Sequence, residues 1–223
     1  MEIIALIIGI FGLLGLIPIF IEFDKYLTML KFCFSKQDLV YESLEITFVI
    51  ESKERIDVYE TGKLLIKKNH PILELSHFNS VGKISHKITR IDNLPISNKY
   101  LKKDPMTDIM RYESNKKVGE KIIYEDEFTC TLDPNKLNFN DDGCQTELTP
   151  YKCKYLYLNV IFPTDFIPSN LNFYEKYNSK TKKCSKETKH YACYANNRKQ
   201  IHWSIKYPKY KHIYSINWRW TPE

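Results

Sequence analysis

Residues 153–162 read CKYLYLNVIF, and apolar side chains alternate with polar ones along this stretch. One face collects Leu156, Leu158, Val160 and Phe162, and the other collects Tyr155, Tyr157 and Asn159. A repeat of two residues is typical of a β-strand with one buried face. Pro163 ends the pattern, since proline cannot donate a hydrogen bond to a neighbouring strand. This stretch therefore predicts a half-buried strand.

Similar patterns recur at short intervals along the chain. We predict further strands at residues 43–51, 56–59, 63–67, 72–75, 82–91, 121–130, 201–207 and 214–220, with Gly62 in a turn and the last two strands paired as a hairpin. Within 92–121 we predict only a helix, Asp104–Tyr112, capped by Asp104 and with Pro105 at its first position. Short strands and little helix predict a mainly β fold, an antiparallel β-sandwich or β-barrel over residues 37–223.

The N-terminal stretch Ile3–Ile21 carries no charged residue. As a helix it would be roughly 28 Å long, which matches the hydrocarbon layer of a bilayer. We therefore predict a single transmembrane helix over residues 1–23 and a juxtamembrane helix over 24–36. A cleavable signal peptide and a buried core helix are the alternatives. The signal peptide is disfavoured because no Lys or Arg precedes the stretch and no small-residue cleavage site follows it.

The residues around the predicted span indicate its orientation and its contacts. Lys25, Lys31 and Lys36 follow it and no basic residue precedes it. Basic residues are retained on the cytoplasmic side, so we expect a single-pass protein of the cell inner membrane with its N-terminus outside and its domain in the cytosol. The expected partners are the lipid bilayer and further copies of the chain. Small residues that let two helices approach closely lie at Ala5, Gly9, Gly12 and Gly15.

The composition limits the classes of function. Six Cys among 223 residues are too few for a disulfide scaffold, and seven Gly without repeats or low-complexity tracts disfavour disorder and solenoids. The net charge of +6 suits anionic lipid, nucleic acid or an anionic ligand. AT-rich codons, which encode Lys, Asn, Ile and Tyr, are the alternative explanation of this bias.

A basic and aromatic stretch, Lys176–Arg198, is the candidate ligand-binding region. Aromatic rings can stack on bases while neighbouring cations hold phosphates, so an anionic ligand or nucleotide is the expected partner. A solvated loop is the alternative interpretation of such a lysine run. The candidate contact residues are Tyr177, Lys182, Lys183, Lys189, Tyr191, Tyr194 and Arg198. The three tryptophans at Trp203, Trp218 and Trp220 alternate with polar residues, and we expect them in the core.

No metal site or catalytic motif is predicted. Cys184, His190 and Cys193 come closest to a metal site, but structural zinc sites supply ligands in pairs two to four residues apart, which this spacing does not fit. Nucleophile-elbow, P-loop, dinucleotide-binding and H-E-x-x-H motifs are all absent from the sequence. We therefore predict no catalytic residue, no cofactor and no enzymatic activity.

An apolar span followed by a β-rich domain resembles the small membrane effectors of bacterial antiphage systems, notably the β-barrel effectors gated by cyclic oligonucleotides. The resemblance rests on Ile3–Ile21, the strand pattern from Ser43 and the closing segment Trp203–Trp218. The chain differs in having one predicted span where two are typical. The resemblance implies a cytosolic domain that senses a signal, oligomerises and makes the spans disrupt the membrane.

Three functional hypotheses follow. The first is a membrane-anchored, non-enzymatic sensor and effector in antiviral defence. The second is an anchored interaction module that tethers a partner protein at the membrane. The third is an anchored hydrolase or nuclease without a recognisable motif.

Overall fold

The structure is a computed structural model of the 223-residue chain. It divides into two compact units, Met1–Ser35 and Lys36–Glu223. In the first unit the described residues Leu27, Met29, Leu30 and Phe32 are helical. The described residues are 27, 29, 30, 32, 36–52, 54–69, 71–78, 82–96, 100–104, 107–132, 142–148, 150–164, 166, 168–178, 180–184, 189–195 and 198–220.

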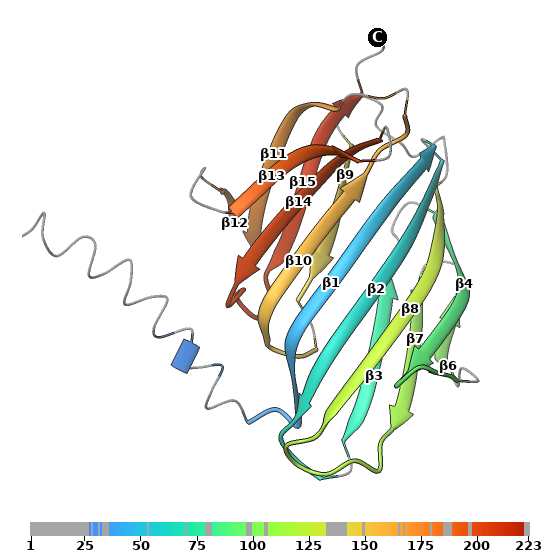
Figure 1. The fold of residues 1–223 in the computed structure, drawn as a ribbon, viewed down its shortest axis with the longest axis vertical. Coiled ribbons are helices and arrows are strands. Elements are labelled where there is room, and N and C mark those ends of the chain that lie inside the picture. Colours follow the sequence, from blue (N-terminus) through green and yellow to red (C-terminus); the bar gives the residue numbers. More distant parts are fainter. Residues whose placement is uncertain are drawn as a thin grey trace, which may run out of the picture. The chain divides into compact units, whose positions relative to one another are not determined.

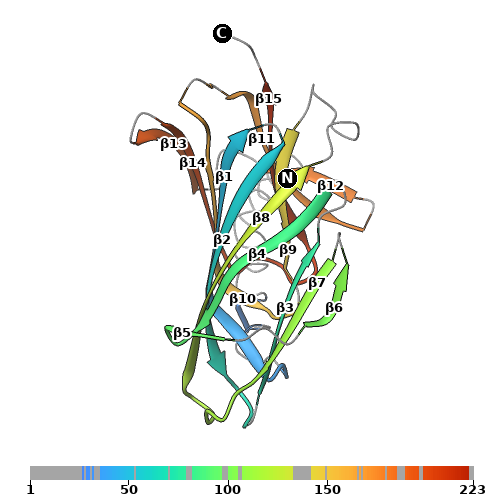
Figure 2. The same cartoon turned by 90° about the vertical axis from the view of Figure 1, so that its right-hand side faces the viewer.

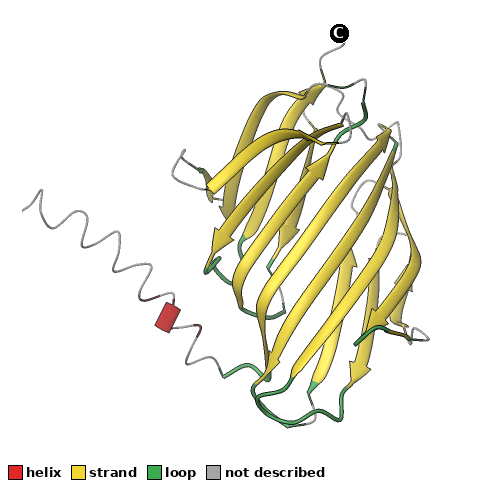
Figure 3. Ribbon diagram, viewed as in Figure 1, coloured by secondary structure: helices red, strands yellow, loops and turns green. Residues whose placement is uncertain are grey.

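The second unit consists of β-strands, which form three sheets (Figure 3). Sheet A has eight strands in the order β13-β14-β10-β1-β2-β8-β4-β5, sheet C has the order β12-β11-β15-β9, and sheet B has the order β3-β7-β6. The strands are β1 (Leu39–Ser52), β2 (Arg55–Ile66), β3 (Ile72–Phe78), β4 (Gly82–Ile91), β5 (Leu94–Pro95), β6 (Tyr100–Asp104), β7 (Thr107–Glu113), β8 (Lys121–Leu132), β9 (Asp142–Glu147), β10 (Cys153–Ile161), β11 (Pro168–Tyr177), β12 (Lys180–Lys183), β13 (Lys189–Ala195), β14 (Arg198–Lys206) and β15 (Ile213–Trp220).

The two smaller sheets lie on the same face of sheet A (Figures 1 and 2). Sheet C lies behind β14 and β10, whereas sheet B lies behind β2, β8 and β4. The core residues of all three sheets form one hydrophobic cluster, which includes Leu73 of sheet B, Leu156 of sheet A and Ile216 of sheet C. The second unit is therefore a layered β-sandwich, and we call the covered face of sheet A its inner face.

Alternation along the strands decides which side chains reach this core. In β10, Leu156, Leu158 and Val160 are at most 1% exposed, whereas the alternating residues Tyr155, Tyr157 and Asn159 are half-buried on the outer face. The strand predicted from this stretch is confirmed. Trp203 and Trp218 are 0% and 2% exposed, which confirms the prediction that they belong to the core.

The strand directions differ from the predicted antiparallel arrangement at one central pair. β10 runs parallel to β1, with Leu156 opposite Leu44 and Val160 opposite Phe48. A parallel pair needs a crossover connection, and here the chain forms sheet B and further strands of both other sheets before it returns as β10.

Three local predictions are wrong. The helix expected at Asp104–Tyr112 is instead the end of β6 and most of β7, and the periodicity of 92–121 faded because its strands are short. Gly62 lies inside β2 rather than in a turn. The last two long strands do not pair as a hairpin, because β14 belongs to sheet A and β15 to sheet C.

The predicted fold class also needs a correction, since it joined a transmembrane helix to the β domain. In the part of the chain that the structure describes, no helix has both the length and the apolar character needed to cross a membrane. The predicted span, residues 1–23, lies outside the described residues. The fold class is therefore mainly β, without a membrane helix among the residues described.

Candidate functional site

The outer face of sheet C carries a hollow of about 320 Å³. Volumes of this size lie at the lower end of the range for small-molecule sites. All four strands of the sheet contribute to its lining, which consists of Gly143, Cys144, Gln145, Tyr174, Lys176, Thr181, Ser215 and Asn217. We call it the sheet C hollow.

The sequence builds this hollow through strand alternation. Phe173 of β11 and Ile216 of β15 point into the core and are 7% and 1% exposed. Their neighbours Tyr174 and Ser215 therefore face outward, directly opposite each other across the two strands. Gly143 makes room for Asn217, because a Cβ atom on this glycine would lie 3.0 Å from the Asn217 Cγ atom.

The lining of the hollow is polar and positively charged. Lys176 supplies its charge, and no carboxylate is among its described lining residues. Lys183 lies opposite Tyr174 in the β11–β12 pair and so shares this face of the sheet. The buried Oδ1 atom of Asn217 has no hydrogen-bond partner among the described residues. The hollow thus offers a cation, hydroxyl groups and side-chain amides to a ligand.

A second polar cluster lies on the inner face of sheet A. Glu60 of β2 lies directly opposite Asp126 of β8, so two carboxyl groups share this face. The Tyr124 hydroxyl donates a hydrogen bond to Glu60 Oε1. The Thr89 hydroxyl donates to Asp126 Oδ1 at 2.7 Å. Gly62 admits the Tyr124 ring, since a Cβ atom there would lie 2.0 Å from a ring carbon.

The surroundings of this cluster change its acid–base properties. Burial of Glu60, together with the nearby charge of Asp126, raises the pKa of its carboxyl from 4.5 to about 7, although the hydrogen bond from Tyr124 opposes this rise. Burial also raises the pKa of the Tyr41 and Tyr124 hydroxyls. Glu60 is thus a carboxyl group that titrates near neutral pH.

A third cluster lies between β11 and β15. His212 Nδ1 lies 2.7 Å from Glu175 Oε1, and Lys209 Nζ lies 3.8 Å from the same oxygen. The Tyr177 ring stacks on the His212 ring with centroids 4.5 Å apart. Tyr177 was a candidate ligand contact, and the structure places it against this histidine.

The predicted ligand-binding residues fall on two different sheets. Tyr177, Lys182 and Lys183 belong to the β11–β12 hairpin of sheet C, whereas Lys189, Tyr191 and Tyr194 lie on β13 and Arg198 begins β14, both in sheet A. Lys182 lies opposite Glu175, on the other face from the hollow. Of this set, only Lys183 shares the face of the hollow.

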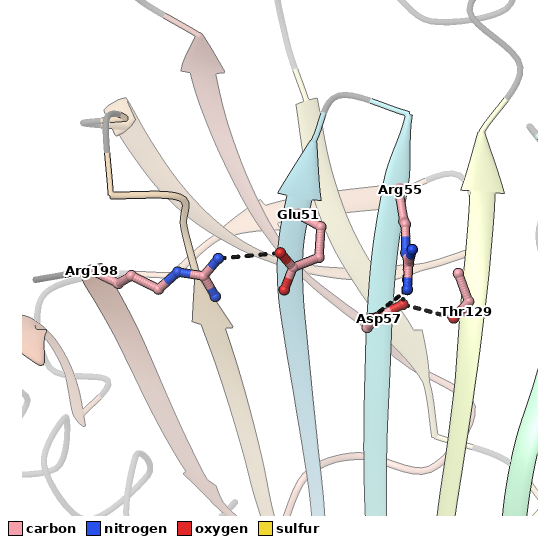
Figure 4. Close-up of polar contacts among 5 residues, drawn as sticks. All are labelled: Glu51, Arg55, Asp57, Thr129 and Arg198. Atoms are coloured by element: carbon pink, nitrogen blue, oxygen red, sulfur yellow. Dashed lines mark hydrogen bonds and ion pairs between the residues drawn. The ribbon is translucent and has the colours of Figure 1, made fainter. Parts of the chain in front are cut away.

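Arg198, another candidate ligand contact, takes part in an ion pair. Its Nη2 atom lies 3.2 Å from Glu51 Oε2 of β1 (Figure 4). In the same view, Arg55 and Thr129 both donate hydrogen bonds to the carboxylate of Asp57. These contacts join the ends of β14 and β1, which lie on either side of β10, and the ends of the adjacent strands β2 and β8.

Sequence reasoning missed most of the hollow. Gln145, Tyr174, Ser215 and Asn217 were not predicted. Their outward alternation was the only available signal, and it is shared by every half-buried strand. The predicted span-association residues Ala5, Gly9, Gly12 and Gly15 lie outside the described residues.

The described residues offer no group of three or more His, Cys, Asp and Glu side chains that could hold a metal ion. Cys130, Cys144, Cys153 and Cys184 are thiols rather than members of disulfides. Burial raises the pKa of Cys130 to about 11 and that of Cys153 to about 12. These two thiols are therefore poor nucleophiles at neutral pH.

Comparisons with known proteins identify a fold but not a family. No family model and no curated protein matches the chain. A putative protease from Parabacteroides distasonis has a similar structure, with a TM-score of 0.51 and 8% identity over 81% of this chain and 40% of that chain. Identity this low shows the fold alone.

Other similar structures are peptidases and hydrolases. An M1 zinc metallopeptidase from Deinococcus radiodurans has a TM-score of 0.46 and 6% identity over 81% of this chain and 42% of that chain. Leukotriene A4 hydrolase from Saccharomyces cerevisiae has a TM-score of 0.45 and 11% identity over 81% of this chain and 29% of that chain. The chain thus spans less than half the length of these proteins. Our prediction that this chain is not an enzyme stays a prediction.

Proposed function

We propose that this chain is a ligand-binding protein whose sheet C hollow holds a small anionic molecule. The observation that carries the proposal is the chemistry of the lining, which combines the Lys176 ammonium group with hydroxyl and amide groups and includes no carboxylate among its described residues. A carboxylate would repel an anion, whereas ammonium and hydroxyl groups attract and orient one.

Four of the lining residues have definite tasks in this proposal. Lys176 forms an ion pair with the anionic group, and Thr181, opposite it across the β11–β12 pair, donates a hydrogen bond from its hydroxyl. The Tyr174 ring offers a flat face on which a base or another planar group can stack. Asn217 Oδ1, which is buried and has no described partner, accepts a hydrogen bond from the ligand. A nucleoside monophosphate combines all of these features.

Binding suits this hollow better than catalysis. General acid–base chemistry at neutral pH usually uses histidine or a carboxylate, and the described lining residues include neither. We therefore keep the predicted sensor role as the proposal. Oligomerisation, a part in antiviral defence and an inner-membrane location stay predictions from the sequence, as does the alternative role as a tether for a partner protein.

Calorimetric titration of the full chain with AMP, inorganic phosphate and adenosine tests the proposal. We expect saturable binding of AMP that weakens as salt concentration rises, because the ion pair with Lys176 is screened. Lys176→Glu should weaken AMP binding at least about tenfold, the effect of one lost charge-assisted contact.

Lys180→Glu is the matched control. Lys180 is an exposed lysine of the same hairpin, but it lies opposite Tyr177 and so faces away from the hollow. We expect this variant to bind AMP like the wild type. The absence of saturable binding of both AMP and phosphate, or equal losses in the two variants, would refute the proposal.

A further inference from the structure

The inner face of sheet A contains a chain of contacts that begins at a carboxyl group and ends on sheet B. Tyr124 donates its hydroxyl proton to Glu60, so the Tyr41 hydroxyl, 3.0 Å away, donates to the Tyr124 oxygen. The Tyr41 ring meets the Tyr151 ring edge-on, with centroids 5.7 Å apart. We call Tyr124, Tyr41 and Tyr151 the tyrosine chain.

The far end of the tyrosine chain holds β3 of sheet B. The Tyr151 hydroxyl accepts a hydrogen bond from the Glu74 backbone N–H at 2.8 Å and donates one to the Ile72 carbonyl at 3.0 Å. Tyr151 lies next to β10 of sheet A in sequence. The tyrosine chain therefore links Glu60 to the backbone of sheet B.

At the near end of the tyrosine chain, the carboxyl groups of Glu60 and Asp126 repel each other when both are charged. Glu60 and Asp126 lie opposite each other on adjacent strands, where like charges destabilise a sheet. The low polarity of a protein interior strengthens this repulsion. One proton on Glu60 removes it, and the protonated carboxyl can still accept the hydrogen bond from Tyr124.

We infer that the Glu60–Asp126 pair is a proton-binding site whose occupancy controls how firmly sheet B packs on sheet A. Protonation leaves the tyrosine chain in place. Loss of the proton puts two negative charges beside Tyr124, and opening of the contact between sheets A and B relieves their repulsion by admitting water. The hydrogen bonds at the far end of the tyrosine chain lead to β3 of sheet B, so we expect the proton to act on the packing of sheet B and to leave that of sheet C unchanged.

Titratable groups on several elements surround Glu60. Among the described residues, Tyr124 and Asp126 of β8 and Tyr41 of β1 interact with Glu60. Tyr151 and Cys153 lie next to Tyr41 instead, and Tyr151 interacts with Glu74 of β3, which pairs with Arg111 of β7 at 3.5 Å. The pKa values of Tyr41, Tyr124 and Tyr151 are raised, Tyr151 to about 12, so these groups stay neutral at physiological pH. Glu60, with a folded pKa of about 7, titrates between pH 5 and pH 8.

The sign of the pH effect follows from linkage. The folded pKa of Glu60, about 7, lies above the ordinary value of 4.5. The folded state therefore binds the proton more tightly, and its stability falls as pH rises from 4.5 to 7 and then levels off. The difference of two to three pKa units sets an upper limit of about two to three powers of ten on the change in the opening equilibrium.

Hydrogen exchange of the full chain between pH 5 and pH 8, corrected for the intrinsic exchange rate, tests this inference. We expect amides of β3 and β7 to lose protection by about tenfold to a hundredfold as pH rises. Amides of β11 and β15 are the internal control and should keep constant protection. An equal change in both sheets would overturn the inference.

Two variants assign the effect to the carboxyl group. Glu60→Gln keeps the shape and the acceptor for Tyr124 but cannot ionise, so protection of β3 should no longer depend on pH. Glu54→Gln is the matched control, because Glu54 is exposed in the turn between β1 and β2, and it should behave like the wild type. Persistence of the wild-type pH dependence in Glu60→Gln would overturn the inference.

A measurement on the wild-type chain covers the case in which Glu60→Gln does not fold. Carbon-13 NMR of the side-chain carboxyl groups should show one glutamate that titrates near pH 7. Absence of any carboxyl group that titrates above pH 6 would overturn the inference. Asp126→Asn removes the opposing charge and should move this titration to lower pH.

Discussion

The inner face of sheet A packs against sheet C in one half and against sheet B in the other, and different interactions stabilise the two halves. Toward sheet C it buries the tryptophan half, which consists of Phe162, Phe173, Trp203, Tyr214 and Trp218. Toward sheet B it buries the tyrosine half, which consists of Tyr41, Glu60, Tyr124, Asp126 and Tyr151. One sheet thus carries an apolar aromatic core and a hydrogen-bonded one side by side.

The tryptophan half depends on ring packing. Trp203 contacts Phe173 and Tyr214 edge-on, at centroid distances of 5.2 and 5.9 Å. The Nε1 atoms of Trp203 and Trp218 are buried without a hydrogen-bond partner among the described residues. Each unpaired donor costs free energy, so the stability of this half comes from its apolar area. Such packing has no reason to vary with pH near neutrality.

The tyrosine half depends on polar groups that satisfy one another. Its hydroxyls supply donors to a carboxyl group that would be costly to bury alone. The comparison teaches that similar aromatic content gives a permanent contact in one half and a proton-dependent contact in the other. Three predictions test this difference, and a fourth concerns the Arg198 ion pair, which lies outside both halves.

Trp203→Ala should have the largest effect. The side chain is fully buried and meets two aromatic rings of sheet C, and loss of a buried tryptophan leaves a large cavity. We expect the free energy of unfolding to fall by about 3–5 kcal/mol, equally at pH 5.5 and pH 7.5. Denaturant titration measures it. Tyr59→Ala, at a side chain that is 42% exposed on the outer face, is the control. A loss below about 1 kcal/mol would show that ring packing does not stabilise this half.

Gly62→Ala tests how closely the tyrosine half is packed. A methyl group at this position would overlap the Tyr124 ring, so we expect a loss of about 1–3 kcal/mol instead of the gain that alanine normally brings to a strand. In a Tyr124→Ala background the same change should cost nothing, because the ring is gone. If the stability losses from Gly62→Ala and Tyr124→Ala simply add in the double variant, the packing of the Tyr124 ring does not depend on Gly62.

Thr89→Val removes a hydrogen bond from the tyrosine half while keeping the shape of the side chain. Thr89 donates to Asp126 at 2.7 Å, and both residues are buried. We expect a loss of about 1.5–3 kcal/mol, as for a hydrogen bond to a charged group. Thr129→Val is the matched comparison. Thr129 donates a hydrogen bond to Asp57, and Asp57 also accepts hydrogen bonds from Arg55 (Figure 4). The loss from Thr129→Val should be smaller, and thermal unfolding of both variants decides the order.

The contrast between the halves could be predicted from the sequence only in part. Alternation in β10 and the burial of Trp203 and Trp218 followed from a period of two, because each strand has one covered face. Gly62 was misread as a turn, since nothing local shows that a tyrosine of β8 covers it. The pairing of Glu60 with Asp126 depends on a register between strands distant in sequence. Such contacts are set by tertiary structure rather than by local pattern.

The predicted ligand-binding residues do not share one surface, although they are close in sequence. Lys182 and Lys183 were grouped with β13 and Arg198 because they are close in sequence, yet the chain passes from sheet C to sheet A between them. The Asp104–Tyr112 segment shows the same limit, since helix-capping residues were outweighed by pairing with β3 and β6. Proximity in sequence predicts a common surface only within one hairpin.

Arg198→Ala should have the smallest effect and tests whether the outer edge of sheet A takes part in binding. The ion pair with Glu51 is partly exposed, with 28% and 39% of the two side chains accessible, and such pairs contribute about 0–1 kcal/mol. We therefore expect a loss of stability within this range by denaturant titration. AMP affinity should stay within about twofold of the wild type, because Arg198 lies on sheet A while the hollow lies on sheet C. A tenfold loss of affinity would instead mean that the ligand reaches both sheets, as a single binding region over Lys176–Arg198 would require.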